Sequence, residues 1–127
     1  MTEPLDADIV KLARGNDAFR REIATGEHSQ VVAMTIPPGE EIGEEVHEEN
    51  DQLLVFIDGR GEAVLEGTTS QVTPNDLVLV PAGTRHNFIN TGGGPLRLVT
   101  VYAPPEHSPG TVHQTREEAD AAEAAEH

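Results

Sequence analysis

Apolar and polar residues alternate in short runs along most of the chain, and this pattern predicts β-strands. The runs are rich in Val, Ile, Leu and Thr, and they end at Gly, Pro, Asn or Asp, which favour turns. The expected strands cover residues 19–25, 29–36, 44–47, 52–58, 61–67, 68–73, 75–83, 85–91 and 96–105. Many short strands with turns at regular intervals indicate an all-β barrel or sandwich.

Both ends of the chain have helical patterns. Residues 6–16 predict a short helix that Asp6 or Asp8 can cap and that stops at Gly15. Residues 115–126 also have helical propensity, but they are polar almost all round, so we expect a helical or frayed tail.

The length of 127 residues fits one domain with one core. We therefore expect a single domain over 1–127, with a barrel core at about 19–104 and a tail at 105–127. The chain has no cysteine, which excludes disulfides and thiolate metal ligands. Any metal must be held by imidazole, carboxylate or amide groups.

The charge and hydropathy of the chain restrict the classes of partner that it can bind. There are 23 acidic against 8 basic residues, a formal net charge of -15, and such a surface repels nucleic acid. No apolar run is long enough to span a bilayer, so we expect no membrane partner. The N-terminal stretch MTEPLDADIV is acidic, unlike a secretory signal, so we expect a cytoplasmic protein.

Four residues in and after the expected strands are candidate metal ligands. Glu45 and His47 are two apart in a strand and therefore project to the same face. If the strands pair side by side, Gln52 and His86 join them. Two imidazoles and one carboxylate suit one divalent ion, with iron favoured and manganese, nickel, cobalt or zinc possible. The alternative is a metal-free pocket in which the histidines hydrogen-bond to Glu45 and Gln52.

Two stretches, residues 39–59 and 75–90, resemble the two sequence motifs of the cupin superfamily, in particular small single-domain cupins of the cupin 2 conserved-barrel type. The matching positions are Gly39, Glu45, His47, Gln52 and Gly59 in the first motif, and Pro81, Gly83, His86 and Asn90 in the second, with Asn75 in place of a glycine. The resemblance implies a double-stranded β-helix (jelly roll) barrel with a metal site inside its mouth.

The sequence departs from the usual first motif at two ligand positions. The first histidine of the motif is Glu45 here, and the usual glutamate is Gln52, so the carboxylate has changed place. The resemblance thus implies a metal-ligand role for His47 and His86, which match the motifs in residue type and position. Glu45 and Gln52 match the ligand positions alone.

The resemblance also implies a function. We expect a metal-dependent enzyme that acts on a small oxygen-rich substrate, a sugar or organic acid, as an isomerase, epimerase-like protein or dioxygenase. Glu45 would be its catalytic base if it binds the metal loosely. The alternatives are a non-catalytic cupin that binds a small molecule and a purely structural module. We also expect a homodimer formed through barrel edges or the strand at 19–25.

Five further residues have open roles. Phe56 and Phe88 are expected to line the barrel as pocket wall or core, and Tyr102 could direct its hydroxyl into the cavity. His107 and His113 lie in a proline-containing segment that is either a surface loop or a cover over the barrel mouth.

Overall fold

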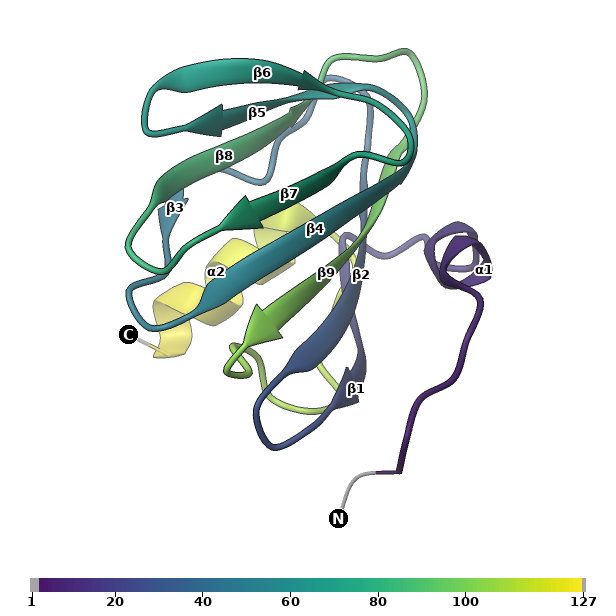
Figure 1. The fold of residues 1–127 in the computed structure, drawn as a ribbon, viewed down its shortest axis with the longest axis vertical. Coiled ribbons are helices and arrows are strands. Elements are labelled where there is room, and N and C mark those ends of the chain that lie inside the picture. The colour runs from purple at the N-terminus through teal and green to yellow at the C-terminus, as the bar shows by residue number, and fades with distance from the viewer. Residues whose placement is uncertain (1–2, 127) are drawn as a thin grey trace.

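The computed structural model describes residues 3–126, so the outermost residues of the expected domain lie outside the described residues. The described part forms an all-β fold with a helix near each end (Figure 1). The elements are α1 (Ile9–Arg14), β1 (Arg20–Thr25), β2 (Gln30–Ile36), β3 (Glu45–Val46), β4 (Asp51–Asp58), β5 (Gly61–Leu65), β6 (Thr68–Val72), β7 (Leu77–Val80), β8 (Arg85–Asn90), β9 (Leu96–Ala103), β10 (Val112–His113) and α2 (Arg116–Glu126).

The strands form two antiparallel sheets. The larger sheet has the order β10-β1-β2-β9-β4-β7, and the smaller has the order β3-β8-β5-β6. The chain crosses repeatedly between the two sheets, so neighbours within a sheet are often distant in sequence (Figure 1). This arrangement confirms the predicted cupin-type jelly roll barrel.

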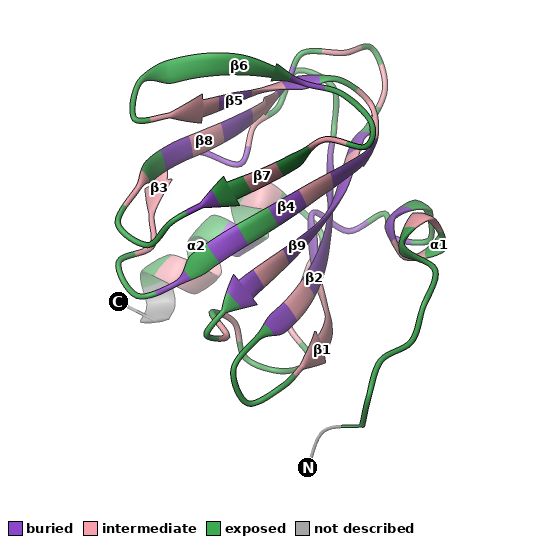
Figure 2. Cartoon of the chain, viewed as in Figure 1, coloured by how far each residue is buried: buried purple, intermediate pink, exposed green. Residues whose placement is uncertain are grey.

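The core lies between the two sheets and is made mainly of aliphatic side chains. Burial alternates along the first six residues of β4, where Gln52, Leu54 and Phe56 are buried and two outward residues, Asp51 and Leu53, are exposed (Figure 2). Phe56 and Phe88 are both fully buried, with ring centroids 5.7 Å apart, which places them in the core. Each such side chain contributes about 1.5–3 kcal/mol through burial.

The predicted strand at 75–83 is shorter in the structure. The strand β7 begins at Leu77, because Asn75 has a φ of 78° and takes part in a turn instead. Its outward residues Leu77 and Leu79 are 64% and 54% exposed. They lie on an edge strand of the larger sheet (Figure 2).

The helix α1 covers the outer face of the larger sheet. Asp8 caps it by accepting hydrogen bonds from the backbone N–H groups of Val10 and Lys11 at 2.9 and 3.1 Å, which decides between the two predicted caps. Its buried residue Ala13 packs with Ile57 and Val99. No helix in the described range is long and apolar enough to cross a membrane.

The C-terminal tail is ordered against the barrel. The strand β10 pairs with β1, a pairing that its two residues gave no pattern to predict. Then α2 begins at a cap where Thr115 Oγ1 accepts from the backbone N–H of Glu118, and Ala119, 2% exposed, packs into the core cluster. The tail is therefore helical, and it brings residues from the end of the chain to the mouth of the barrel.

Candidate metal centre

Glu45, His47 and His86 meet inside the barrel mouth. Glu45 in β3 is directly opposite His86 in β8, and His47 follows β3 by one residue. One ligand atom of each lies within 4.8 Å of the other two. Glu45 Oε2 is 2.9 Å from His47 Nε2 and 3.9 Å from His86 Nε2. Glu45 and His47 lie together as the sequence predicts, but the predicted strand at 44–47 is only Glu45–Val46 in the structure, so His47 stands in the segment that follows it.

The ring of His86 is oriented by the backbone. Its Nδ1–H donates to the carbonyl of Thr84 at 2.9 Å, since a carbonyl can only accept. Nε2 therefore carries the lone pair; it is buried and makes no hydrogen bond within residues 3–126. Burial lowers the pKa of His86, more than the Thr84 bond and Glu45 raise it. A neutral imidazole with a free, buried Nε2 is the form that binds a metal.

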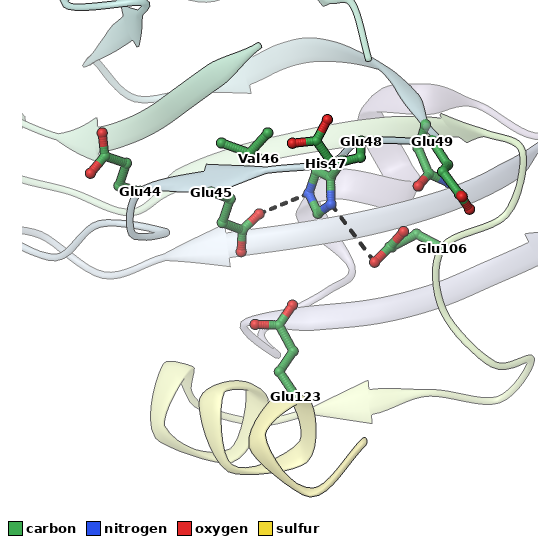
Figure 3. Close-up of a pocket in the computed structure, with 9 residues that line it drawn as sticks. Glu44, Glu45, Val46, His47, Glu48, Glu49, Glu106 and Glu123 are labelled. Atoms are coloured by element: carbon green, nitrogen blue, oxygen red, sulfur yellow. Dashed lines mark hydrogen bonds and ion pairs between the residues drawn. The ribbon is translucent and has the colours of Figure 1, made fainter. Parts of the chain in front are cut away.

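His47 lies between two carboxylates. Its Nε2 is 2.9 Å from Glu45, and its Nδ1 is 3.7 Å from Glu106 Oε1 (Figure 3). Burial alone lowers the pKa of His47, but the hydrogen bond and charge of Glu45, with the charge of Glu106, raise it overall. If a cation takes the Nε2 lone pair, the proton stays on Nδ1, next to Glu106.

Glu45 is the ionised member of the group. Burial raises its pKa, but the hydrogen bond and charge of His47, together with the charges of Arg20 and His86, hold it below the usual value. Its side chain is 18% exposed, against 10% for His47. Glu45 is therefore an anion in a largely desolvated place, which favours a cation beside it.

Gln52 contributes an amide to the same interior. Its Nε2 donates to the hydroxyls of Thr100 at 3.1 Å and Tyr102 at 3.3 Å. Its Oε1 is buried without a hydrogen-bond partner in the described structure. A buried, unpartnered carbonyl oxygen is a suitable further ligand, although Gln52 as a ligand stays a prediction. The Tyr102 hydroxyl points to Gln52, and its ring lies 5.7 Å from that of His47.

The mouth opens into an acidic cleft of about 440 Å³ (Figure 3). It is lined by Glu44, Glu45, Val46, His47, Glu48, Glu49, Asn50, Glu106 and Glu123. Glu106 and Glu123 come from the tail, which lies beyond both cupin motifs. The hint in the sequence is the order EHSPGTVH, in which an acid and two histidines share one short segment.

The segment after β9 folds over the mouth, which decides between the two predictions for this loop. Gln30 Oε1 accepts from the backbone N–H groups of Glu106 and His107, and its Nε2 donates to the carbonyl of His107 at 2.6 Å. The His107 ring meets Tyr102 edge-on at 5.2 Å. His113 contacts Arg20 instead, so neither histidine joins the group of three candidate ligands.

The donor set fits a divalent cation. One ionised carboxylate and two imidazoles converge, and His86 Nε2 and Gln52 Oε1 are buried polar atoms that protein groups within 3–126 leave unsatisfied. Hydrogen bonding of an imidazole to a backbone carbonyl, as at His86, is the usual support of a metal-binding histidine.

The fold and the site are those of a small β-barrel protein with a candidate ion site in its mouth, and comparison with known proteins names the family. The family model described as "Cupin domain" matches residues 32–102, more than half of the chain. The chain belongs to the cupin family.

The relatives are close in sequence and structure. The chain is 41% identical over 127 residues to the uncharacterized protein YrkC of Bacillus subtilis, covering 95% of this chain and 68% of that protein. The structure of BH2720 from Bacillus halodurans superposes with a TM-score of 0.92 at 42% identity, covering 94% and 95% of the two chains. A mannose-1-phosphate guanylyltransferase of Salmonella montevideo is 32% identical over 76 residues, covering 60% of this chain and 16% of that enzyme.

Proposed function

We propose that this cupin is a metal-dependent enzyme that binds one divalent ion through Glu45, His47 and His86, with Gln52 as a fourth ligand. The observation that carries the proposal is the convergence of three ligand atoms within 4.8 Å, one of them the unsatisfied Nε2 of His86. Iron, manganese, zinc, nickel and cobalt all accept such ligands.

The substrate class follows from the charge of the site. One carboxylate leaves a divalent centre with a net charge of about +1, which suits hydroxyl, carbonyl or carboxylate oxygens. A sugar or an organic acid offers these groups. When bound, the metal supplies Lewis acidity that polarises a substrate oxygen.

Side chains of the protein would orient the ligands and transfer protons. Glu45 is ionised and beside His47, so a Glu45 that binds the ion only loosely can accept a proton from a substrate carbon or hydroxyl. Glu106 holds the orientation of His47 from its other side. This arrangement serves isomerisation or epimerisation, and a dioxygenase reaction is the second enzymatic candidate. Oxygen uptake with candidate diols or enols separates the two.

A non-catalytic small-molecule-binding cupin is the alternative. The enclosure of the site supports it, because Gln30 fixes the loop that covers the mouth and thereby favours binding of a small ligand. Turnover of any sugar or hydroxy acid by metal-loaded protein would decide for the enzyme.

The test of the metal site is metal analysis of protein purified without added metal. We expect about one divalent ion per chain in the wild type and at least about a tenfold weaker affinity in Glu45→Gln. Glu44→Gln is the matched control: Glu44 is the preceding residue, and its exposed side chain pairs with Arg85 at 3.6 Å. Equal metal content in wild type and Glu45→Gln would exclude Glu45 as a ligand.

We also propose a homodimer in the cytoplasm. The strand β1 is paired on both sides, with β2 and β10, so the supporting feature is the edge strand β7, whose Leu77 and Leu79 are exposed beside Leu53. Light scattering should give twice the chain mass, and Leu79→Glu should reduce it. A monomeric wild type at high concentration would contradict the dimer.

A further inference from the structure

Arg20 in β1 is a buried arginine with incomplete hydrogen bonding. It is 2% exposed, its Nη1 is 3.4 Å from Nδ1 of His113, and its guanidinium carbon is 5.5 Å from the ring centroid of Phe19. Its Nε is buried and has no hydrogen-bond partner in the described structure. None of the ion pairs formed by the described side chains includes Arg20.

The missing acceptor contrasts with the abundance of acidic residues in the chain. The sequence has 23 acidic against 8 basic residues, so acidic partners are abundant. Four other arginines do form ion pairs with acids: Arg14, Arg85, Arg97 and Arg116. The charge of Arg20 acts to lower the pKa of Glu45 and of Glu123, but no side chain accepts from its Nε–H. A buried N–H group without an acceptor is destabilising. The Nε–H group therefore indicates an acceptor that the described residues do not provide.

Arg20 faces the barrel interior. It pairs across β1 and β2 with Met34, which is fully buried in the core. Its charge lowers the pKa of Glu45, so the guanidinium acts on the candidate metal centre. Arg21, the next residue, lies on the opposite face of the strand, and its Nε donates to Asn16 Oδ1 at 3.1 Å.

A second unpartnered group lies in the same interior. His107 Nε2 is buried without a hydrogen-bond partner among residues 3–126. The ring of Tyr102 is 5.2 Å from that of His107 and 5.7 Å from that of His47. The tail imidazole and the metal-ligand group therefore contact the same tyrosine.

We propose that Arg20 binds the carboxylate of a small monoanionic ligand, whose hydroxyl or carbonyl oxygen reaches the centre formed by Glu45, His47 and His86. This rests on the proposed function and narrows its substrate class to a monocarboxylate such as a hydroxy acid. The Nε and Nη donors of a guanidinium match the two oxygens of a carboxylate.

The acidic cleft sets the limit of one negative charge. Six glutamates line the cleft, so each further anionic group on the ligand meets repulsion at the mouth. The ligand's outer end is therefore neutral or cationic, and phosphate esters and dicarboxylates are disfavoured.

The first experiment needs no metal. Acetate is titrated into metal-free protein while the Nε–H signals of Arg20 and Arg21 are followed by ¹H–¹⁵N NMR. We expect the Arg20 signal to shift with saturation and the Arg21 signal to stay, because Arg21 is already bonded to Asn16. If the Arg20 signal did not shift up to about 100 mM acetate, the affinity for a carboxylate would be too weak to matter. That result would overturn the proposal.

The second experiment uses nickel-loaded protein and glycolate, with ethylene glycol as the uncharged probe. Arg20→Gln should weaken glycolate binding at least about tenfold relative to ethylene glycol. It should not weaken nickel binding, because the loss of a positive charge near Glu45 favours a cation there. The melting temperature should stay equal or rise. Arg20→Lys keeps a charge and should bind between wild type and Arg20→Gln, and Arg21→Gln should match the wild type.

The outcomes separate the two proposals. Glycolate binding that is unchanged in Arg20→Gln overturns the role of Arg20 while the metal site stands. If the wild type does not bind nickel but acetate still shifts the Arg20 signal, the proposed metal-dependent enzyme is overturned and the anion site is supported. A large drop in the melting temperature of both Arg20 variants without acetate would assign Arg20 to structure alone.

Discussion

The loop over the mouth predicts a specific loss of stability in acid, caused by His107. Burial, together with the charge of Arg20, lowers the pKa of His107 from 6.5 to about 3. In the unfolded chain the imidazole has its ordinary pKa. At pH values below it, the unfolded state therefore binds a proton, while the imidazole of the folded state stays neutral. The contribution of His107 is therefore complete above the unfolded pKa and is lost as the pH falls toward the folded pKa.

The size of the effect follows from this shift. Between about pH 7 and about pH 5 the unfolded imidazole becomes almost fully protonated while the folded one stays neutral, which amounts to about 2 kcal/mol of lost stability. His107→Phe keeps a ring beside Tyr102 but has nothing to titrate, so the variant should lose about 2 kcal/mol less than the wild type over this range.

Urea unfolding followed by circular dichroism at both pH values measures the difference. Other titrating groups contribute equally to the two proteins and cancel. His28→Gln is the control, because the side chain of His28 is 88% exposed and should behave as wild type. If the wild type and His107→Phe lost the same free energy on acidification, the imidazole would be free to protonate in the folded state and the enclosure of the loop would be wrong.

Three further substitutions test the fold around the site. Phe56→Ala should lower the free energy of unfolding by about 3–5 kcal/mol, since the ring is fully buried against Phe88; a loss under about 1 kcal/mol would contradict this packing. Asn90→Ala should lower the free energy of unfolding by about 2–3 kcal/mol in urea, because three side-chain hydrogen bonds are lost. The amide nitrogen donates to the carbonyls of Ile36 and Gly94, and the amide oxygen accepts from the N–H of Gly92; an unchanged midpoint would refute the prediction. Gln30→Ala should speed amide hydrogen exchange at residues 106–107 at least about tenfold, since Gln30 Oε1 accepts from both backbone amides; unchanged exchange would show that other contacts hold the segment.

The barrel was predictable because its signals are local. Alternation along the strands marks which residues face the core, as the burial of β4 shows. The pairing of Glu45 with His86 needed more than periodicity, and the spacing of the two motifs supplied it. The predicted convergence of Glu45, His47 and His86 is present in the structure, whereas their role as ligands stays a prediction.

The rest of the site was missed for a physical reason. Arg20 belongs to FRREIAT, where consecutive charged residues indicate a solvated strand face. The strand β1 is covered because β10 pairs with it and α2 follows β10. The two residues of β10 carry too little pattern to predict this pairing. Glu106 and Glu123 reach the cleft through the same tail. Long-range packing, and not local propensity, determines their position.

The strand β3 is two residues long and, among the strands, pairs with β8 alone. Its Glu45 faces His86 across that single ladder. An ion held by both residues would act as a cross-link between a marginal edge strand and the body of the barrel. Affinity for the ion and order of this edge would then be thermodynamically linked, so substitutions in β3 that contact no ion would still tune how tightly it is held.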